Sequence, residues 1–300
     1  MHELTETAAR LYGLGTGNMK AAAAAKIMAL RRLDAARDAW RGSVILSLVA
    51  DECVFGPDGA AHLLSARPDL RGEHLICGEG PGAMNLAVAE KGLMWVRLRA
   101  RGRVGQGMQT TRGSSAPARL AMALARIDGW NDQSQDPPLP NLHHVANAEG
   151  MRLSVTIGRI AGGQGFSPAV SQAEADIDLR LPPGLTHAEI AGRLDTLCAD
   201  GTLSWNLIKG WEANWSDPAG PLARAIRDVA LSVRGTTPRD VTRLPASDAV
   251  RWRAPGVPAV CYGPQPDLAS GADDHVLRQH FLDCIAIHAG AVAHLGHTAE

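Results

Sequence analysis

The sequence predicts an α/β protein in which a mixed, mostly parallel sheet is flanked by helices and a smaller α+β domain is inserted. Nearly continuous apolar runs at 43–50 and 257–262 indicate strands buried on both faces, as in parallel sheets covered by helices. Between these runs, apolar and polar residues alternate over several segments, which is typical of strands with one buried face. The two patterns together predict two domains of different architecture in one chain.

The first helix is expected directly after a glycine-rich segment. Asn18 can cap it, because an amide oxygen accepts hydrogen bonds from the free N–H groups of a first helical turn. Apolar residues then recur at helical spacing and predict a helix face composed of Met19, Ala23, Ile27 and Leu30. The buried strand at 43–50 follows this helix.

The middle of the chain predicts the order β-α-β-β-α-β, an antiparallel sheet with two helices. The alternating segments that predict its strands are 93–101, 151–157, 173–180 and 203–207. One helix carries Leu120, Leu124 and Ile127, and the other opens with a capping box formed by Thr186 and Glu189.

The main domain resumes after this insertion. A helix ends at Gly235, a buried strand follows at 257–262, and 276–295 predicts a closing helix. The apolar positions of the first of these helices are Leu222, Ile226, Val229 and Val233. The expected boundaries are 1–91 and 212–300 for the main α/β domain and 92–211 for the inserted domain.

Composition narrows the classes of partner and the compartment. The 300 residues suit two domains, and the 45% hydrophobic content supports a sizeable core. Thirty basic and 31 acidic residues leave a net charge of −1, which argues against nucleic acid or an anionic membrane surface as a partner. Five cysteines at irregular spacing indicate reduced thiols, and neither a signal segment nor a long apolar run is present, so a cytoplasmic protein is expected.

A series of short motifs points to chemistry at the ends of the predicted strands. In chain order they are Gly13–Lys20 (GLGTGNMK), Asp51-Glu52-Cys53, Ile76–Pro81 (ICGEGP), Lys91–Trp95 (KGLMW), Ser247-Asp248-Ala249 and Gly256–Pro264 (GVPAVCYGP). The glycines of the first motif do not form a dinucleotide loop, because no strand precedes them and no ribose-binding acid follows at the right distance. Taken together, the motifs resemble the M20 family of metallopeptidases and deacylases over nearly the whole chain.

The resemblance implies two zinc ions, and most of their expected ligands are replaced here. The positions of four ligands are occupied by Asn18, Cys53, Glu79 and Ser270, and only Glu79 keeps a carboxylate. The His-x-Asp pair expected before the first motif is missing from residues 1–10. Too few donors remain to hold two dications, so no intact zinc pair is expected, although residual zinc binding stays open.

Other functional positions follow from the same resemblance. Glu52 matches the general base, and Gln106 stands where a histidine of the lid or dimerisation domain steadies the oxyanion. Ser115 replaces an asparagine of the following helix. Cys53 can be a nucleophile beside Glu52, but a small structural thiol is the simpler interpretation.

Charged residues predict where a substrate binds. Arg180 and Arg251 can each grip a carboxylate through a bidentate guanidinium, although Arg180 fits a surface strand equally well. Asp248 is expected to line the pocket or to cap a turn.

Two functional hypotheses of different class remain. The first is a repurposed enzyme acting on a small amide or N-acyl amino acid, and the second is a catalytically silent homologue that binds a ligand or a partner. The resemblance also implies a homodimer through the 92–211 domain. The alternative is a complementing subunit, because a missing N-terminal strand leaves a sheet edge to be covered.

Overall fold

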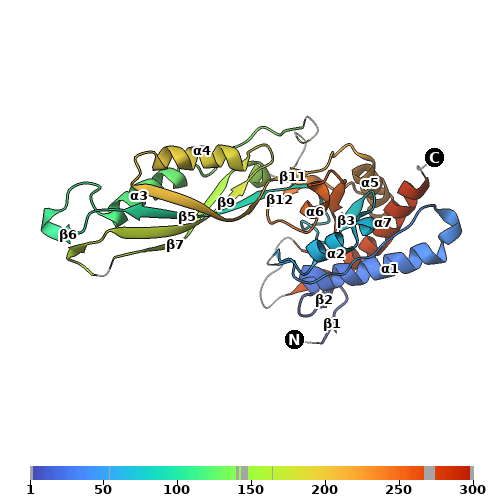
Figure 1. The fold of residues 1–300 in the computed structure, drawn as a ribbon. Helices are drawn as coiled ribbons and strands as arrows, with labels where there is room; N and C mark the ends of the chain where they lie inside the picture. Colours follow the sequence, from blue (N-terminus) through green and yellow to red (C-terminus); the bar gives the residue numbers. More distant parts are fainter. Residues whose placement is uncertain are drawn as a thin grey trace. The chain divides into compact units, whose positions relative to one another are not determined.

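The structure, a computed structural model, divides into two compact units (Figure 1). It describes residues 3–53, 55–139, 142, 148–163, 165–266 and 274–297. Unit 1 comprises Met1–Glu90, Leu139–Asn147 and Asn214–Glu300, and unit 2 comprises Lys91–Pro138 and Ala148–Ala213. Leu139–Asn147, expected inside the inserted domain, groups with unit 1, where Leu142 is 1% exposed in the core.

The main sheet of unit 1 is mixed. Its order is β11 (Asn214–Trp215), β4 (Leu86–Glu90), β13 (Ala259–Cys261) and β3 (Leu75–Cys77), and β12 (Asp240–Arg243) also pairs with β4. The pairs β12–β4 and β13–β3 are parallel, whereas β11–β4 and β13–β4 are antiparallel. The α/β class with a mixed sheet is confirmed, and the two parallel pairs contain seven of the ten residue pairs that join these strands.

Helices cover this sheet, and a small second sheet accompanies it. The helices are α1 (Ala21–Ala35), α2 (Ala60–Ala66), α5 (Pro221–Arg234), α6 (Val250–Arg253) and α7 (Arg278–His297). The closing helix α7 packs against both α1 and α5. The second sheet has the order β1 (Thr5–Glu6), β2 (Arg10–Tyr12) and β14 (His275–Leu277). As expected, α5 ends at Gly235, whose φ of 71° is a left-handed conformation that glycine adopts readily.

The first helix is present, but its cap and its buried face were predicted wrongly. Thr16–Lys20 forms a π-helical turn that continues into α1, so Asn18 lies inside the helical segment. The carboxylate of Asp274 accepts hydrogen bonds from the backbone N–H groups of Gly15 (2.5 Å) and Gly17 (2.6 Å) instead. Ile27 is 43% exposed, and the buried face consists of Ala21, Ala22, Ala25, Ala29 and Leu33. Small alanine side chains let neighbouring elements approach closely, which the apolar pattern did not reveal.

The buried strand expected at 43–50 does not form. These residues have no regular secondary structure, and Ile45, Leu48 and Val49 are 49%, 58% and 40% exposed. A strand needs a neighbour for its backbone N–H and C=O groups, and no described strand of unit 1 pairs with this segment. Glu52, expected at the end of that strand, lies in a turn instead.

Unit 2 has the predicted β-α-β-β-α-β order. Its elements are β5 (Gly92–Arg101), α3 (Ala116–Asp128), β7 (Ser154–Gly162), β9 (Gln172–Leu181), α4 (His187–Cys198) and β10 (Leu203–Trp211). The sheet order is β10-β5-β9-β7, and every adjacent pair is antiparallel. Both helices contribute to one core on one face of this sheet, and the capping box of Thr186 and Glu189 is formed (Figure 1). A two-stranded sheet joins β6 (Gly105–Gln106) to β8 (Pro168–Ala169).

Short helical turns complete the described elements. The 3-10 turns are Arg37–Ala39, Pro68–Arg71, Gly107–Gln109 and Ala148–Met151. Within the described ranges, no helix has both the length and the apolar character needed to cross a membrane.

Candidate functional site

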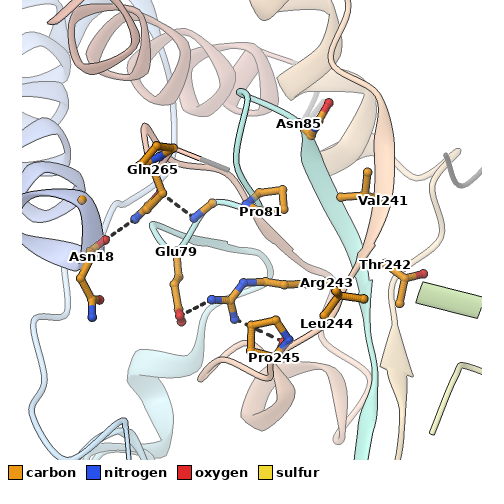
Figure 2. A pocket seen from close by; sticks show the side chains of 13 residues that line it. Asn18, Glu79, Pro81, Asn85, Val241, Thr242, Arg243, Leu244, Pro245 and Gln265 are labelled. Atoms are coloured by element: carbon orange, nitrogen blue, oxygen red, sulfur yellow. Dashed lines mark hydrogen bonds and ion pairs between the residues drawn. The ribbon is translucent and has the colours of Figure 1, made fainter. Parts of the chain in front are cut away.

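Unit 1 contains a pocket of about 420 Å³ at the ends of its parallel strands (Figure 2). The loops that follow β3 and β13 line it, as do the end of β12 and the glycine-rich turn before α1. Its lining residues are Gly17, Asn18, Glu79, Gly80, Pro81, Asn85, Val241, Thr242, Arg243, Leu244, Pro245, Gln265 and Pro266. Adjacent parallel strands bring their carboxyl ends to one edge of a sheet, which is where α/β folds place their ligands.

An ion pair between Glu79 and Arg243 forms one wall of the pocket (Figure 2). The side chain of Arg243 is 8% exposed and that of Glu79 is 18% exposed. Arg243 also donates a hydrogen bond of 2.7 Å to the carbonyl oxygen of Ala246, which fixes the guanidinium. Burial raises the pKa of Glu79, and the charge of Arg243 opposes that shift. A protein cation therefore already neutralises the carboxylate that the resemblance marks as a zinc ligand.

Gln265 joins the loops that surround the pocket. Its Nε2 donates to the carbonyl oxygen of Asn18 (2.6 Å), and its Oε1 accepts from the N–H of Gly80 (2.8 Å) (Figure 2). The same Nε2 also donates to the carbonyl oxygen of Gly78 (3.0 Å). The residue is 5% exposed, so these hydrogen bonds replace the bonds to water that its amide loses on burial. Gln265 thus holds the glycine-rich turn and the loop after β3 together.

Glu52 lies in the electrostatic neighbourhood of this ion pair. Burial raises the pKa of Glu52 to about 7, and the charges of Glu79 and Asp248 add to the shift. Asp248 has a partner of its own, since Nε of Arg251 lies 3.1 Å from its Oδ1. Glu52 is therefore half-ionised near neutral pH, the condition in which a carboxyl group can both take and give a proton.

The structure places Cys53 at the surface. Its side chain is exposed, and the adjacent Glu52 raises the pKa of the thiol. Because the thiolate is the nucleophilic form, this environment disfavours the nucleophile hypothesis. Ser270, at the position implied for the last zinc ligand, lies outside the described residues.

The remaining predicted site residues belong to unit 2. Gln106 is exposed in β6, and Ser115 precedes α3 without a side-chain capping bond. Arg180 in β9 makes hydrogen bonds of 2.9 and 3.0 Å to the carboxylate of Asp178. Its guanidinium already has a carboxylate partner, as expected of a surface strand residue.

The donors in the described part of the chain do not fit a zinc pair. No group of three or more His, Cys, Asp or Glu side chains in the described residues is arranged to hold a metal ion. Asn18 lines the pocket with a neutral amide, Cys53 is exposed, and Glu79 is bound by Arg243. Zinc needs several imidazole, thiolate or carboxylate ligands at close range, and these positions do not supply them.

Sequence reasoning missed the two residues that organise the pocket. Arg243 stands directly before the Leu244-Pro245 segment, and a charged residue among apolar neighbours near Ser247-Asp248 was the available signal. Gln265 follows Tyr262-Gly263-Pro264, and its amide gave no comparable signal.

Comparison with known proteins establishes the family. Residues 2–294 match the model of peptidase family M20/M25/M40, and the chain belongs to this family. It is 27% identical over 281 residues to a succinyl-diaminopimelate desuccinylase of Stenotrophomonas maltophilia (strain R551-3), covering 89% of this chain and 70% of that protein.

Solved structures share the fold at lower identity. A tripeptidase of Staphylococcus aureus has a TM-score of 0.73 at 13% identity, covering 99% of this chain and 77% of that one. The aminopeptidase PepT of Bacillus cereus has a TM-score of 0.69 at 16% identity, covering 98% and 76%. A dipeptidase of Saccharomyces cerevisiae has a TM-score of 0.57 at 11% identity. The match covers 80% of this chain but only 63% of the dipeptidase chain.

Proposed function

We propose that this chain is a repurposed member of its family that binds or transforms a small amino-acid-like or N-acyl ligand without a dinuclear zinc pair. The observation that carries the proposal is the buried ion pair of Glu79 and Arg243 in the pocket wall. The guanidinium supplies positive charge where zinc would otherwise offset the carboxylate.

The energetics of this pair oppose metal binding at Glu79. A metal ion could take the carboxylate only by displacing Arg243, whose side chain is 8% exposed. Breaking a buried ion pair in this way leaves an uncompensated charge and costs about 3–5 kcal/mol. A lone carboxylate with weak neighbours offers too little coordination energy to offset that cost.

The pocket's size and lining support a small polar ligand. A volume of about 420 Å³ lies in the range of small-molecule sites. The side chains of Asn18, Asn85 and Thr242 offer amide and hydroxyl groups suited to an amide or carboxylate. The desuccinylase and peptidase names of the relatives are consistent with such a ligand.

A reaction at this pocket would use Glu52 for proton transfer; Glu52 is not one of the lining residues, but it interacts electrostatically with Glu79 and Arg243 in the wall. Its pKa of about 7 suits a group that takes a proton from water and returns it to a leaving amine. In unit 1, Arg251 would bind a carboxylate of the substrate. The roles that the resemblance implies for Gln106, Ser115 and Arg180 of unit 2 stay predictions.

A second candidate function is a catalytically silent binding protein. The observation that favours it is that Glu79 and Asp248 both have arginine partners, Arg243 and Arg251. In either case we propose a homodimer through unit 2 or a complementing subunit, and a cytoplasmic location.

Elemental analysis of the purified protein, paired with turnover of N-acyl amino acids with and without added zinc or cobalt, tests the proposal. We expect substoichiometric metal and no effect of a chelator. Stoichiometric metal with chelator-sensitive hydrolysis would overturn it. Glu52→Gln separates the two candidates: a repurposed enzyme loses turnover while calorimetry still detects ligand binding, whereas a silent protein shows binding alone in both forms.

A further inference from the structure

Two cysteines of unit 1 face each other across adjacent parallel strands. Cys77 ends β3 and Cys261 ends β13, and the two residues are direct partners in the register of these strands. Adjacent strands lie roughly 4.8 Å apart. That spacing falls within the Cα separations of about 4.4–6.8 Å at which disulfides form. The register therefore places the two Cα atoms at a separation that a disulfide can bridge.

The two thiols lie in different environments. Cys261 is fully buried, and its Sγ lies 3.2 Å from Oε1 of Glu90 and 3.3 Å from the hydroxyl of Ser247. Cys77 is partly exposed, and the Nζ of Lys26 donates a hydrogen bond to the carbonyl oxygen of the preceding residue, Ile76.

These environments assign different roles to the two sulfurs. Cys77 is partly exposed whereas Cys261 is buried, so an oxidant in solvent reaches the sulfur of Cys77 first, and Cys261 is its buried neighbour.

We propose that Cys77 and Cys261 form a redox-active pair that a hydroperoxide oxidises to an intramolecular disulfide. The Cys77 thiolate attacks the peroxide oxygen, forming an S–O bond while the O–O bond breaks and hydroxide leaves as water. The Cys261 sulfur then attacks the Cys77 sulfur, forming the S–S bond as the S–O bond breaks. The second hydroxide leaves as water with the thiol proton, so two thiols and one hydrogen peroxide give one disulfide and two waters.

The disulfide would affect the pocket because the residues that follow Cys77 in the chain contact or line it. Gly78 follows Cys77 directly, and its carbonyl oxygen accepts the 3.0 Å hydrogen bond from Gln265. Glu79 comes next and pairs with Arg243. Oxidation therefore ties the strand end that positions Glu79 to β13. The redox pair does not depend on which ligand the pocket binds.

The test uses the full-length chain with Cys53→Ser and Cys198→Ser, which leaves Cys77, Cys261 and Cys284 as its thiols. The folded protein is treated with hydrogen peroxide at neutral pH, quenched with catalase, denatured, and titrated with a thiol reagent. We expect a loss of two thiols per chain that dithiothreitol restores. Peptide mapping by mass spectrometry without reductant is expected to join the Cys77 and Cys261 peptides.

Matched variants assign the steps. Further replacement of Cys284 by serine keeps the loss of two thiols. Cys261→Ala stops the oxidation at a sulfenic acid on Cys77, which dimedone traps, and Cys77→Ala prevents it. If the alanine variants fail to fold, peptide mapping of the parent protein decides alone. Retention of all three thiols, or a cross-link that involves Cys284, overturns the proposal.

Discussion

At the scale of single residues, the buried charge of Arg243 is held in place by Glu79. Arg243→Met leaves the carboxylate buried without a partner, and we expect the free energy of unfolding at neutral pH to fall by about 3–5 kcal/mol. The double variant with Glu79→Gln and Arg243→Met is expected to lose less free energy of unfolding than the sum of the losses of the two single variants, because no unpaired charge remains. Urea unfolding of the two single variants and the double variant measures this coupling.

An exposed ion pair supplies the control for this cycle. Arg67 and Asp69 pair at 2.7 Å with side chains 60% and 59% exposed, so Arg67→Met is expected to leave the free energy of unfolding nearly unchanged. Equal losses for Arg243→Met and Arg67→Met would show that the pocket pair is solvated and would remove its argument against metal.

Glu52 gives the stability of the protein a pH dependence, and burial of its carboxyl group fixes the sign. Its pKa in the folded protein is about 7, against an ordinary value of 4.5, so the folded state binds this proton more tightly than the unfolded chain. Stability from this group is highest below pH 4.5 and is lost as pH rises toward 7. Glu52→Gln is therefore expected to stabilise the protein at pH 8 by roughly 1–2 kcal/mol, after allowance for solvent screening, and to have little effect at pH 4.5.

Thermal unfolding at both pH values measures the effect of Glu52→Gln. Glu73→Gln, at an exposed position, serves as the control and is expected to leave both values unchanged. A variant that is destabilised at pH 8 would mean that the Glu52 carboxylate is stabilised in its ionised form, which would contradict a raised pKa.

At the scale of elements, the glycine-rich turn depends on the charge of Asp274, which directly precedes the distant strand β14. Asp274 accepts hydrogen bonds from Gly15 and Gly17, where the free N–H groups of the helical turn favour a negative charge. Asp274→Asn retains one acceptor oxygen and loses the charge, so we expect a loss of about 1–3 kcal/mol in the free energy of unfolding.

Guanidinium unfolding of Asp274→Asn, compared with Asp228→Asn on the exposed face of α5, measures this contribution. The change in the free energy of unfolding is expected to be near zero for Asp228→Asn. Because Asp274 holds the turn that presents Asn18, hydrogen exchange at residues 15–20 is also expected to rise in Asp274→Asn alone. Equal exchange in both variants would show that the turn is stable without its anionic partner.

The elements that could be predicted from sequence are those whose signal is local. The alternation of β5 and β9, the capping box of α4 and the glycine stop of α5 each depend on residues a few positions apart. The strand expected at 43–50 failed because pairing depends on a neighbouring strand, which no local pattern reports. The buried face of α1 was predicted wrongly because its alanines, and not the more apolar Ile27, pack against the neighbouring elements.

The pocket shows the same limit at the level of contacts. Its carboxylate was located from the motif around Glu79, but its partner Arg243 lies 164 positions away in the chain. Gln265 is 247 positions from Asn18, whose carbonyl it binds. A single sequence indicates candidate residues, but it does not show which residues far apart in the chain come into contact. The fold therefore decides which charges neutralise one another.

At the scale of the whole molecule, each unit has its own hydrophobic core and its own exposed apolar residues. Unit 2 presents Leu207 and Ile208, 47% and 52% exposed, on β10, an edge strand of its sheet. Unit 1 presents Ile45 and Leu48, 49% and 58% exposed, in the segment at 43–50. Exposed apolar side chains on an unpaired edge are a template for association, so the two units offer two separate surfaces for a partner.

The proposal of a homodimer through unit 2 distinguishes these two surfaces. Leu207→Lys with Ile208→Lys places charge on the β10 edge and is expected to weaken dimerisation at least about tenfold, the equivalent of about 1.4 kcal/mol. Ile45→Lys with Leu48→Lys, the matched variant of unit 1, is expected to leave the dimer intact. Sedimentation equilibrium of the three proteins gives the dissociation constants. A monomeric parent protein contradicts the homodimer. A dimer weakened only by the unit 1 variant contradicts association through unit 2 and assigns it to the 43–50 segment, because the apolar side chains of that segment are then the ones that the dimer buries.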